Sequence, residues 1–132
     1  MSAIGVPAGY HTLTPYVLTA NAAALIDFLI KAFDGVERVR MARPDGSMQH
    51  AQVAIGDSVV MLGEPKPPFV PTPASVYVYV GDADAVFQRA IGCGATIVIP
   101  IADQFYGDRM GGVRDPLGNL WWIATRGSAA TV

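Results

Sequence analysis

The sequence repeats its own pattern at a spacing of 61 residues. Tyr16-Val17 recurs as Tyr77-Val78, and Gly46 recurs as Gly107. Few of the paired residues are identical, but apolar, turn and helix-capping residues follow in the same order in both halves. A chain of 132 residues built from two copies of one supersecondary unit predicts a pseudo-symmetric fold. Its natural ligand site is a groove between or within the two copies.

The first half is predicted to contain a strand, a helix and three further strands. Alternating residues favour a strand over 12–18, and Asn21 is expected to cap a helix over 22–33, whose apolar residues fall on one face. Gly56-Asp57 is typical of a tight hairpin turn. The three strands that follow the helix are predicted over 36–42, 48–55 and 58–62.

A proline-rich segment separates the halves. Five of the nine residues from 65 to 73 are proline, which fixes φ and cannot donate to a ladder, so the segment predicts a stiff linker. The second half repeats the first, with Asp82 capping a helix over 83–92 and a loop over 104–109. Its strands are predicted over 75–80, 95–101, 110–114 and 120–124.

These elements predict an α+β fold with two tandem βαβββ modules. The modules span residues 10–64 and 75–125, joined by the linker 65–74, within a single domain over 1–132. We expect a curved mixed sheet around a groove, with the helices on the outside.

Composition narrows the possible functions. The net charge is −2 and Lys and Arg do not cluster, which disfavours a nucleic-acid partner. No apolar run approaches the length of a membrane span, and the N-terminus lacks a signal-peptide pattern. The single Cys93 fits a reducing cytoplasm. Apolar residues make up 52% of the chain and charged residues only 15%, which indicates a homodimer interface, an apolar pocket or a plain aliphatic core.

Two loop sequences in the second half carry a resemblance to a known family. They are Phe105-Tyr106-Gly107-Asp108-Arg109 and Asp115-Pro116-Leu117-Gly118-Asn119-Leu120-Trp121. Together with the duplicated βαβββ pattern, they resemble the vicinal oxygen chelate superfamily over residues 10–125. That superfamily holds glyoxalase I, extradiol dioxygenases, fosfomycin-resistance enzymes and bleomycin-binding proteins.

The resemblance implies where a metal would bind. Enzymes of the superfamily hold a divalent metal with His or Glu from the first and fourth strands of each module. The corresponding positions here are Thr14, Met61, Ser75 and Trp122. A catalytic metal needs about three nitrogen, carboxylate or thiolate ligands, which these residues do not supply. We therefore expect no metal cofactor; the alternative is a divalent metal at a displaced site.

His50 is the best single candidate for chemistry. If Gly56-Asp57 is a two-residue turn, Gln52 pairs with Met61 and His50 with Gly63, so His50 and Gln52 face the groove. His50 would then bind ligand or act as a general base, with Glu64 as a possible partner; the alternative is a structural histidine. His11 is expected to be structural.

Aromatic residues supply the other candidates. Tyr77, Tyr79 and Trp122 share a strand face, which favours a cleft that stacks flat ligands over ordinary packing. The segment Phe105–Arg109 either covers the groove or is held by a local salt bridge. The predicted ligand-binding residues are Tyr16, His50, Gln52, Met61, Tyr77, Tyr79, Phe105, Tyr106, Arg109, Val113 and Trp122.

Two functions fit these features. The first is a homodimeric, bleomycin-resistance-like protein that sequesters a planar natural product or antibiotic without a metal and without catalytic residues. The alternative is a lyase, isomerase or oxygenase with a displaced metal and His50 and Glu64 in proton transfer. Metal content of the purified protein discriminates between them.

Overall fold

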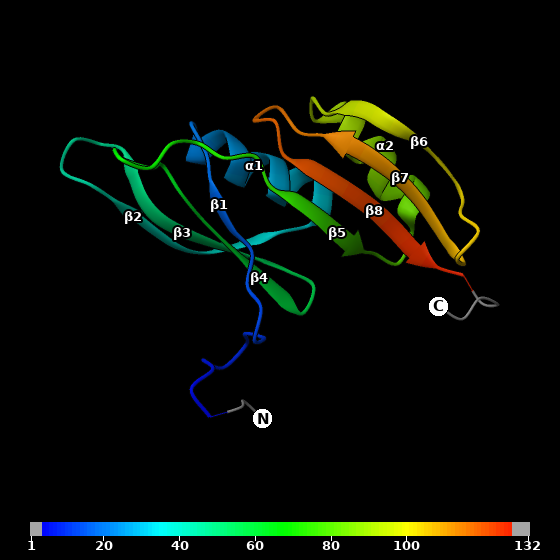
Figure 1. Cartoon of the computed structure of the whole chain (residues 1–132), viewed down its shortest axis with the longest axis horizontal. Coiled ribbons are helices and arrows are strands. Elements are labelled where there is room, and N and C mark those ends of the chain that lie inside the picture. Colours follow the sequence, from blue (N-terminus) through cyan, green and yellow to red (C-terminus); the bar gives the residue numbers. More distant parts are fainter. Residues whose placement is uncertain (1–3, 128–132) are drawn as a thin grey trace. The chain divides into compact units, whose positions relative to one another are not determined.

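The computed structural model describes residues 4–127, and the chain divides into two compact units between Pro73 and Ala74. The first unit contains one helix, α1, and four strands (Figure 1). Their bounds are β1 Tyr16–Leu18, α1 Ala22–Phe33, β2 Val36–Ala42, β3 Met48–Ile55 and β4 Ser58–Gly63. The strand order is β1-β4-β3-β2, with β1 parallel to β4 and the other pairs antiparallel.

The second unit repeats this arrangement. Its elements are β5 Ser75–Tyr79, α2 Ala83–Gly92, β6 Thr96–Asp103, β7 Asp108–Arg114 and β8 Leu120–Arg126. The strand order is β5-β8-β7-β6, again with one parallel pair, β5 with β8. The predicted α+β class and the two βαβββ modules are confirmed. Among residues 4–127 the ladders form two four-stranded mixed sheets, one in each module.

Each helix covers one face of its own sheet because its apolar residues recur on one side. In the first module Leu25 and Leu29 of α1 are fully buried, as are Ala51, Val53 and Leu62 of the sheet. Burying a leucine side chain contributes roughly 1.5–3 kcal/mol, so this face holds the module together. The opposite face of each sheet remains available for other contacts.

Both helices begin in the same way. Asn21 and Asp82 cap them through Oδ1, which accepts from the N–H groups of Ala24 and Ala85 at 3.1 Å. The predicted bounds of the helices, 22–33 and 83–92, are confirmed.

Several predicted strand boundaries are wrong. β6 and β8 end two residues later than predicted, at Asp103 and Arg126, and the starts of β1 and β7 also differ. β1 begins at Tyr16 rather than at residue 12, directly after Pro15, which has no N–H for a ladder. β7 begins at Asp108, within the segment predicted as loop, because Gly107, at φ 100°, ends the turn and the strand resumes at once. Asp108 and Arg109 pair with Arg126 and Thr125 of β8.

None of the helices among residues 4–127 has both the length and the apolar character needed to span a bilayer.

Candidate functional site

The first module presents a mixed polar and aromatic face opposite α1. Gln52 of β3 pairs with Met61 of β4, which pairs with Tyr16 of β1, and cross-strand partners share a face. The predicted pairing of Gln52 with Met61 is confirmed. His50 stands on the same face, with its ring edge-on to that of Tyr16 at a centroid distance of 6.4 Å. The structure therefore brings Tyr16, His50, Gln52 and Met61 together, as predicted.

A short hydrogen-bond chain fixes the half-buried His50. The Tyr10 hydroxyl donates to Oε1 of Gln52, which leaves the Gln52 amide nitrogen to face Nε2 of His50 at 3.0 Å. An amide nitrogen only donates, so Nε2 of His50 accepts and the proton of the neutral ring lies on Nδ1. The lone pair that a general base would use is thus occupied by Gln52.

Glu64 holds elements of the fold together. Its Oε2 accepts from the N–H of Ala22, the first residue of α1, at 2.9 Å, and its Oε1 accepts from the N–H of Met48 at 2.8 Å. Both carboxylate oxygens therefore bind backbone groups. In the second module the same place is taken by Thr125, whose Oγ1 accepts from the N–H of Ala83 at 2.8 Å. Since neither hydrogen bond of Glu64 involves His50, the two residues do not form the predicted acid–base pair within the described structure.

The second module presents an aromatic face opposite α2. Tyr77 pairs with Trp122, which pairs with Gly112, so all three share this face. The indole of Trp122 packs closely against Gly112: a Cβ at that glycine would stand 2.7 Å from two of the indole ring carbons. The indole Nε1 donates to Oγ of Ser75 at 2.9 Å. The rings of Tyr77 and Tyr79 lie side by side at a centroid distance of 5.3 Å and remain 39% and 60% exposed.

A buried carboxylate, Asp108, anchors the tyrosine rings. Its Oδ2 accepts from the hydroxyls of Tyr77 at 2.7 Å and Tyr79 at 2.8 Å, and its Oδ1 accepts from Nη1 of Arg126 at 3.2 Å. The Tyr106 hydroxyl lies 3.0 Å from that of Tyr77. We call Asp108 with Tyr77, Tyr79, Tyr106 and Arg126 the tyrosine cluster.

The protonation of the tyrosine cluster is set by these bonds. The hydrogen bond from Tyr77, with those from Tyr79 and Arg126, lowers the pKa of Asp108 against the effect of burial. Burial and the hydrogen bonds with Tyr106 and Asp108 raise the pKa of Tyr77, and the bond to Asp108 raises that of Tyr79. At neutral pH Asp108 is therefore a carboxylate, and Tyr77 and Tyr79 are neutral donors to it.

The anchoring role of Asp108 was not predicted from the sequence, which placed Asp108 in a loop over 104–109. A four-residue turn ending in glycine was the available signal, because it places Asp108 at the start of the next strand. Neighbouring strand residues face opposite sides, so Asp108 and Arg109 diverge.

Arg109 forms a salt bridge, but its closest partner is Asp84 at the start of α2 and not a residue of the same loop. Its Nε and Nη2 bind the two carboxylate oxygens of Asp84 at 2.7 and 3.0 Å, and its Nη1 lies 3.2 Å from Asp103. These pairs raise the pKa of Arg109. Phe105 is 97% exposed, with its ring edge-on to Tyr106. Tyr106 therefore joins the aromatic face through Tyr77, whereas Arg109 binds the start of α2.

Val113 lies on the wrong face for the predicted ligand surface. It is fully buried and pairs with Trp121, which is buried on the side of α2. The constant spacing of 61 residues aligns Val113 with Gln52. In the ladders Gln52 pairs with Met61, and the corresponding pair in the second module is Gly112 with Trp122. The counterpart of Gln52 is therefore Gly112, at a spacing of 60 residues. A shift of one residue in a strand reverses the face of every side chain.

The positions that the resemblance gives to metal ligands do not fit a divalent cation. Thr14 lies just before β1, Met61 and Trp122 offer a thioether and an indole, and the Ser75 hydroxyl accepts from Trp122. Among residues 4–127, no three His, Cys, Asp or Glu side chains gather as a metal site.

Comparisons with known proteins agree with this architecture. The model of the Glyoxalase/Bleomycin resistance protein/Dioxygenase superfamily matches residues 10–123. The uncharacterized protein Rv0887c of Mycobacterium tuberculosis H37Rv is 41% identical over 120 residues, covering 83% of this chain and 71% of its own.

Two solved structures share the fold. TioX from Micromonospora sp. ML1 has a TM-score of 0.74 and 28% identity, covering 88% of this chain and 98% of its own. TnmS3, an antibiotic binding protein from Streptomyces sp. CB03234, has a TM-score of 0.71 and 20% identity, covering 91% and 98%. On its sequence and its fold, this chain belongs to the glyoxalase/bleomycin resistance protein/dioxygenase superfamily.

Proposed function

We propose that this protein binds a planar aromatic small molecule, such as an antibiotic or another natural product, and sequesters it unchanged and without a metal. The observation that carries the proposal is the exposed aromatic face of the second module. Tyr77 and Tyr79 present their rings there beside Trp122, each held by its polar end.

The fixed rings favour binding because little rotational freedom remains to be lost. The hydroxyls of Tyr77 and Tyr79 are bound to the buried Asp108, and the indole of Trp122 is bound to Ser75. Ordering a flexible side chain on binding costs about 0.5–1.5 kcal/mol, and a preformed surface avoids that cost. Stacking on such rings gains affinity from any flat apolar ligand.

The polar residues also support binding rather than proton transfer. Nε2 of His50 accepts from Gln52, and both oxygens of Glu64 accept from backbone N–H groups. A general base needs a free lone pair within reach of its substrate. The antibiotic-binding character of the structurally similar TnmS3 supports the same proposal.

A ligand panel tests the proposal. Purified protein is titrated with planar natural products, bleomycin-type antibiotics among them, while tryptophan fluorescence is followed; Trp122 reports on the face and the buried Trp121 supplies a constant background. The ligand is then recovered and weighed by mass spectrometry. We expect saturable quenching and an unchanged ligand mass. A product of altered mass that disappears in His50→Ala would replace sequestration with catalysis.

We further propose a cytoplasmic homodimer in which each ligand groove is lined by both chains. The support is compositional: 52% of the residues are apolar, and large apolar side chains such as Val36, Met41, Ile97 and Ile99 are exposed. Sedimentation at micromolar protein concentration should give twice the chain mass of 13.9 kDa. A single species at the monomer mass would contradict this part of the proposal.

A further inference from the structure

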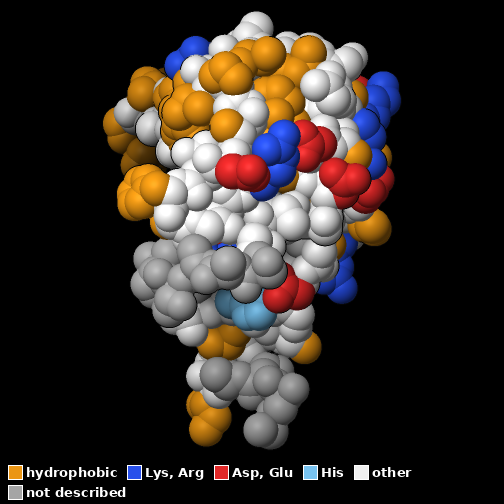
Figure 2. All heavy atoms as spheres, turned by 90° about the vertical axis from the view of Figure 1, so that its right-hand side faces the viewer, with side chains coloured by type: hydrophobic (Ala, Val, Ile, Leu, Met, Phe, Trp, Pro, Cys, Tyr) orange, Lys and Arg blue, Asp and Glu red, His pale blue; other side chains and the backbone are white. Residues whose placement is uncertain are grey.

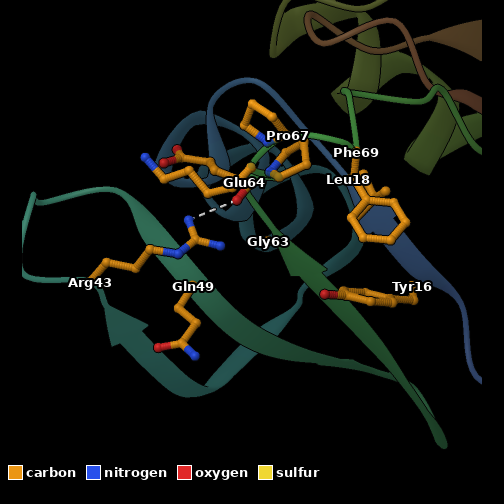
Figure 3. Close-up of a pocket in the computed structure, with 10 residues that line it drawn as sticks. Tyr16, Leu18, Arg43, Gln49, Gly63, Glu64, Pro67 and Phe69 are labelled. Atoms are coloured by element: carbon orange, nitrogen blue, oxygen red, sulfur yellow. Dashed lines mark hydrogen bonds between the residues drawn. The ribbon is translucent and has the colours of Figure 1, made fainter.

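The first unit contains a cavity of about 370 Å³ that the aromatic face of the second module does not explain. It lies where β4 ends and the proline-rich segment begins (Figure 3). Pockets that bind small molecules start at roughly 300 Å³, so the cavity has room for a ligand of a few fused rings. Its lining residues are Tyr16, Leu18, Arg43, Gln49, Gly63, Glu64, Pro65, Lys66, Pro67 and Phe69.

The two ends of the cavity differ in chemistry. Figure 3 shows the rings of Tyr16 and Phe69 at one end and the guanidinium of Arg43 at the other, with Gly63 and Glu64 between them. Both rings are largely exposed, at 57% and 67%, and so have apolar surface left to bury. One end is therefore suited to a flat apolar body and the other to a polar group.

Arg43 gives the polar end a positive charge. Its Nη1 donates to three neutral oxygens, the carbonyl of Glu64 at 2.8 Å, Oγ of Ser47 at 3.1 Å and the carbonyl of Met48 at 3.4 Å. These bonds fix the half-buried guanidinium but do not neutralise it. Within residues 4–127, no carboxylate forms an ion pair with Arg43.

The other charged groups near the cavity are already bound within the fold. Nζ of Lys66 lies 2.7 Å from Oδ2 of Asp45, and this bond lowers the pKa of Asp45. The carboxylate of Glu64 accepts from the first N–H of α1, where the helix dipole favours negative charge. Both oxygens of Glu64 are thus bound to backbone donors, whereas the hydrogen bonds of Arg43 use Nη1 alone, so Arg43 is the cation with donors left for a ligand.

We propose that this cavity binds a planar aromatic carboxylate. The ring system lies against Tyr16 and Phe69, and the carboxylate binds the guanidinium of Arg43. A fixed guanidinium binds a carboxylate through charge-assisted hydrogen bonds, which are about twice as strong as neutral ones. The inference goes beyond the proposed function, because the cavity lies wholly in the first unit and its ligand has a defined charge.

A pair of probes tests the charge preference. Anthracene carboxylate and the neutral anthracene carboxamide differ only in the charged group. Calorimetric titration of the full chain should show the carboxylate binding at least about tenfold more tightly than the carboxamide. Equal affinities, or no binding of either probe, would overturn the proposal.

Three variants locate the preference. Arg43→Met should abolish the difference between the probes, and Phe69→Ala should weaken both probes alike. Lys31→Met removes the same charge from a surface pair with Asp27 on α1 and should leave the difference intact. A preference that survives Arg43→Met, or disappears in Lys31→Met, would contradict the assignment.

Arg43 also supports the fold through Nη1, so a second measurement uses the unaltered chain. In isotope-labelled protein, anthracene carboxylate should shift the amide resonances of Gly63, Lys66 and Phe69 before those of other residues. Shifts confined to residues outside the cavity would place the carboxylate elsewhere and overturn the proposal.

Discussion

At the scale of single residues, Trp122 carries the proposed function. Stacking of a base on an aromatic side chain is worth about 1–3 kcal/mol in other proteins, a fair guide for any planar ring. Trp122→Ala should therefore weaken a planar ligand by about ten- to a hundredfold, measured by calorimetric titration. His50→Ala should cost about 1 kcal/mol if the imidazole makes one hydrogen bond to the ligand. Unchanged affinity in Trp122→Ala together with lost product formation in His50→Ala would contradict sequestration.

Asp108 makes a pH-dependent contribution to the stability of the second module. Hydrogen bonds hold the pKa of Asp108 below its unfolded value, about 3.9, so the folded state favours the ionised group. This contribution is complete above the unfolded pKa and is lost as the pH falls through the lower folded value. Asp108→Asn should therefore be less stable than the wild type at neutral pH, and the difference should shrink below about pH 4.

Thermal unfolding across the acid range measures this difference. Asp27→Asn is the control, because its carboxylate pairs with Lys31 on the surface, and it should stay close to the wild type throughout. A gap between Asp108→Asn and wild type that stays constant from neutral to acid pH would show that Asp108 does not act through its charge.

The positions and roles of individual side chains could be predicted from the sequence only in part. Tyr77, Tyr79 and Trp122 could be placed on one face of the sheet, because alternation along a strand fixes which side chains share a face. Asp108 was missed because its role depends on tertiary structure. It is buried and binds the hydroxyls of two tyrosines from a strand about thirty residues earlier, a contact that no local pattern encodes. The bonds of Glu64 to two distant backbone groups were hidden for the same reason.

At the scale of elements, two adjacent glycines of β7 face opposite sides of the sheet, Gly111 toward α2 and Gly112 toward Trp122. A Cβ on Gly111 would stand 2.6 Å from the Phe87 ring of α2 and 2.9 Å from the backbone of Ile101, whereas one on Gly112 would meet only the Trp122 ring closely. Gly111→Ala should destabilise the protein by about 1–3 kcal/mol, since the buried helix–sheet contact has no room to yield. Gly112→Ala should lose less stability but weaken planar ligands, because the indole of Trp122 must move to make room for the methyl group.

Urea unfolding and ligand titration of both variants measure this contrast. Each variant serves as the control for the other, since both add one methyl group to the same strand. Equal effects on stability and binding would show that the two faces of β7 are not specialised.

The limits of prediction at this scale come from register. The helices were predictable because capping residues and apolar spacing are local. The order of the strands followed from the duplicated pattern. Which residues of β7 face the aromatic side did not follow from that pattern. The connection from β7 to β8, residues 115–119, is longer than the turn Gly56-Asp57 of the first module. The spacing of the repeat changes from 61 to 60 residues in that strand, which moved Val113 to the wrong side.

At the scale of the whole molecule, we predict that the purified protein carries no stoichiometric metal. The residues at the superfamily's metal positions, Thr14, Met61, Ser75 and Trp122, lack the ligand atoms that a divalent cation prefers. Elemental analysis of protein prepared without added metal is the test. A content of about one zinc, nickel, iron or manganese per chain would contradict the prediction and favour the enzyme alternative.

The pairing of the first and last strands within each module affects how the chain can fold during its synthesis. β1 pairs with β4 and β5 pairs with β8, so the first and last strands of each unit bond to each other. Among residues 4–127, every strand ladder lies inside one unit. The first unit therefore has all its backbone partners once Pro73 has left the ribosome, and it can form its sheet while the second is still being translated. Duplication thus allows the first half of the chain to complete its own sheet before the second half has been synthesised.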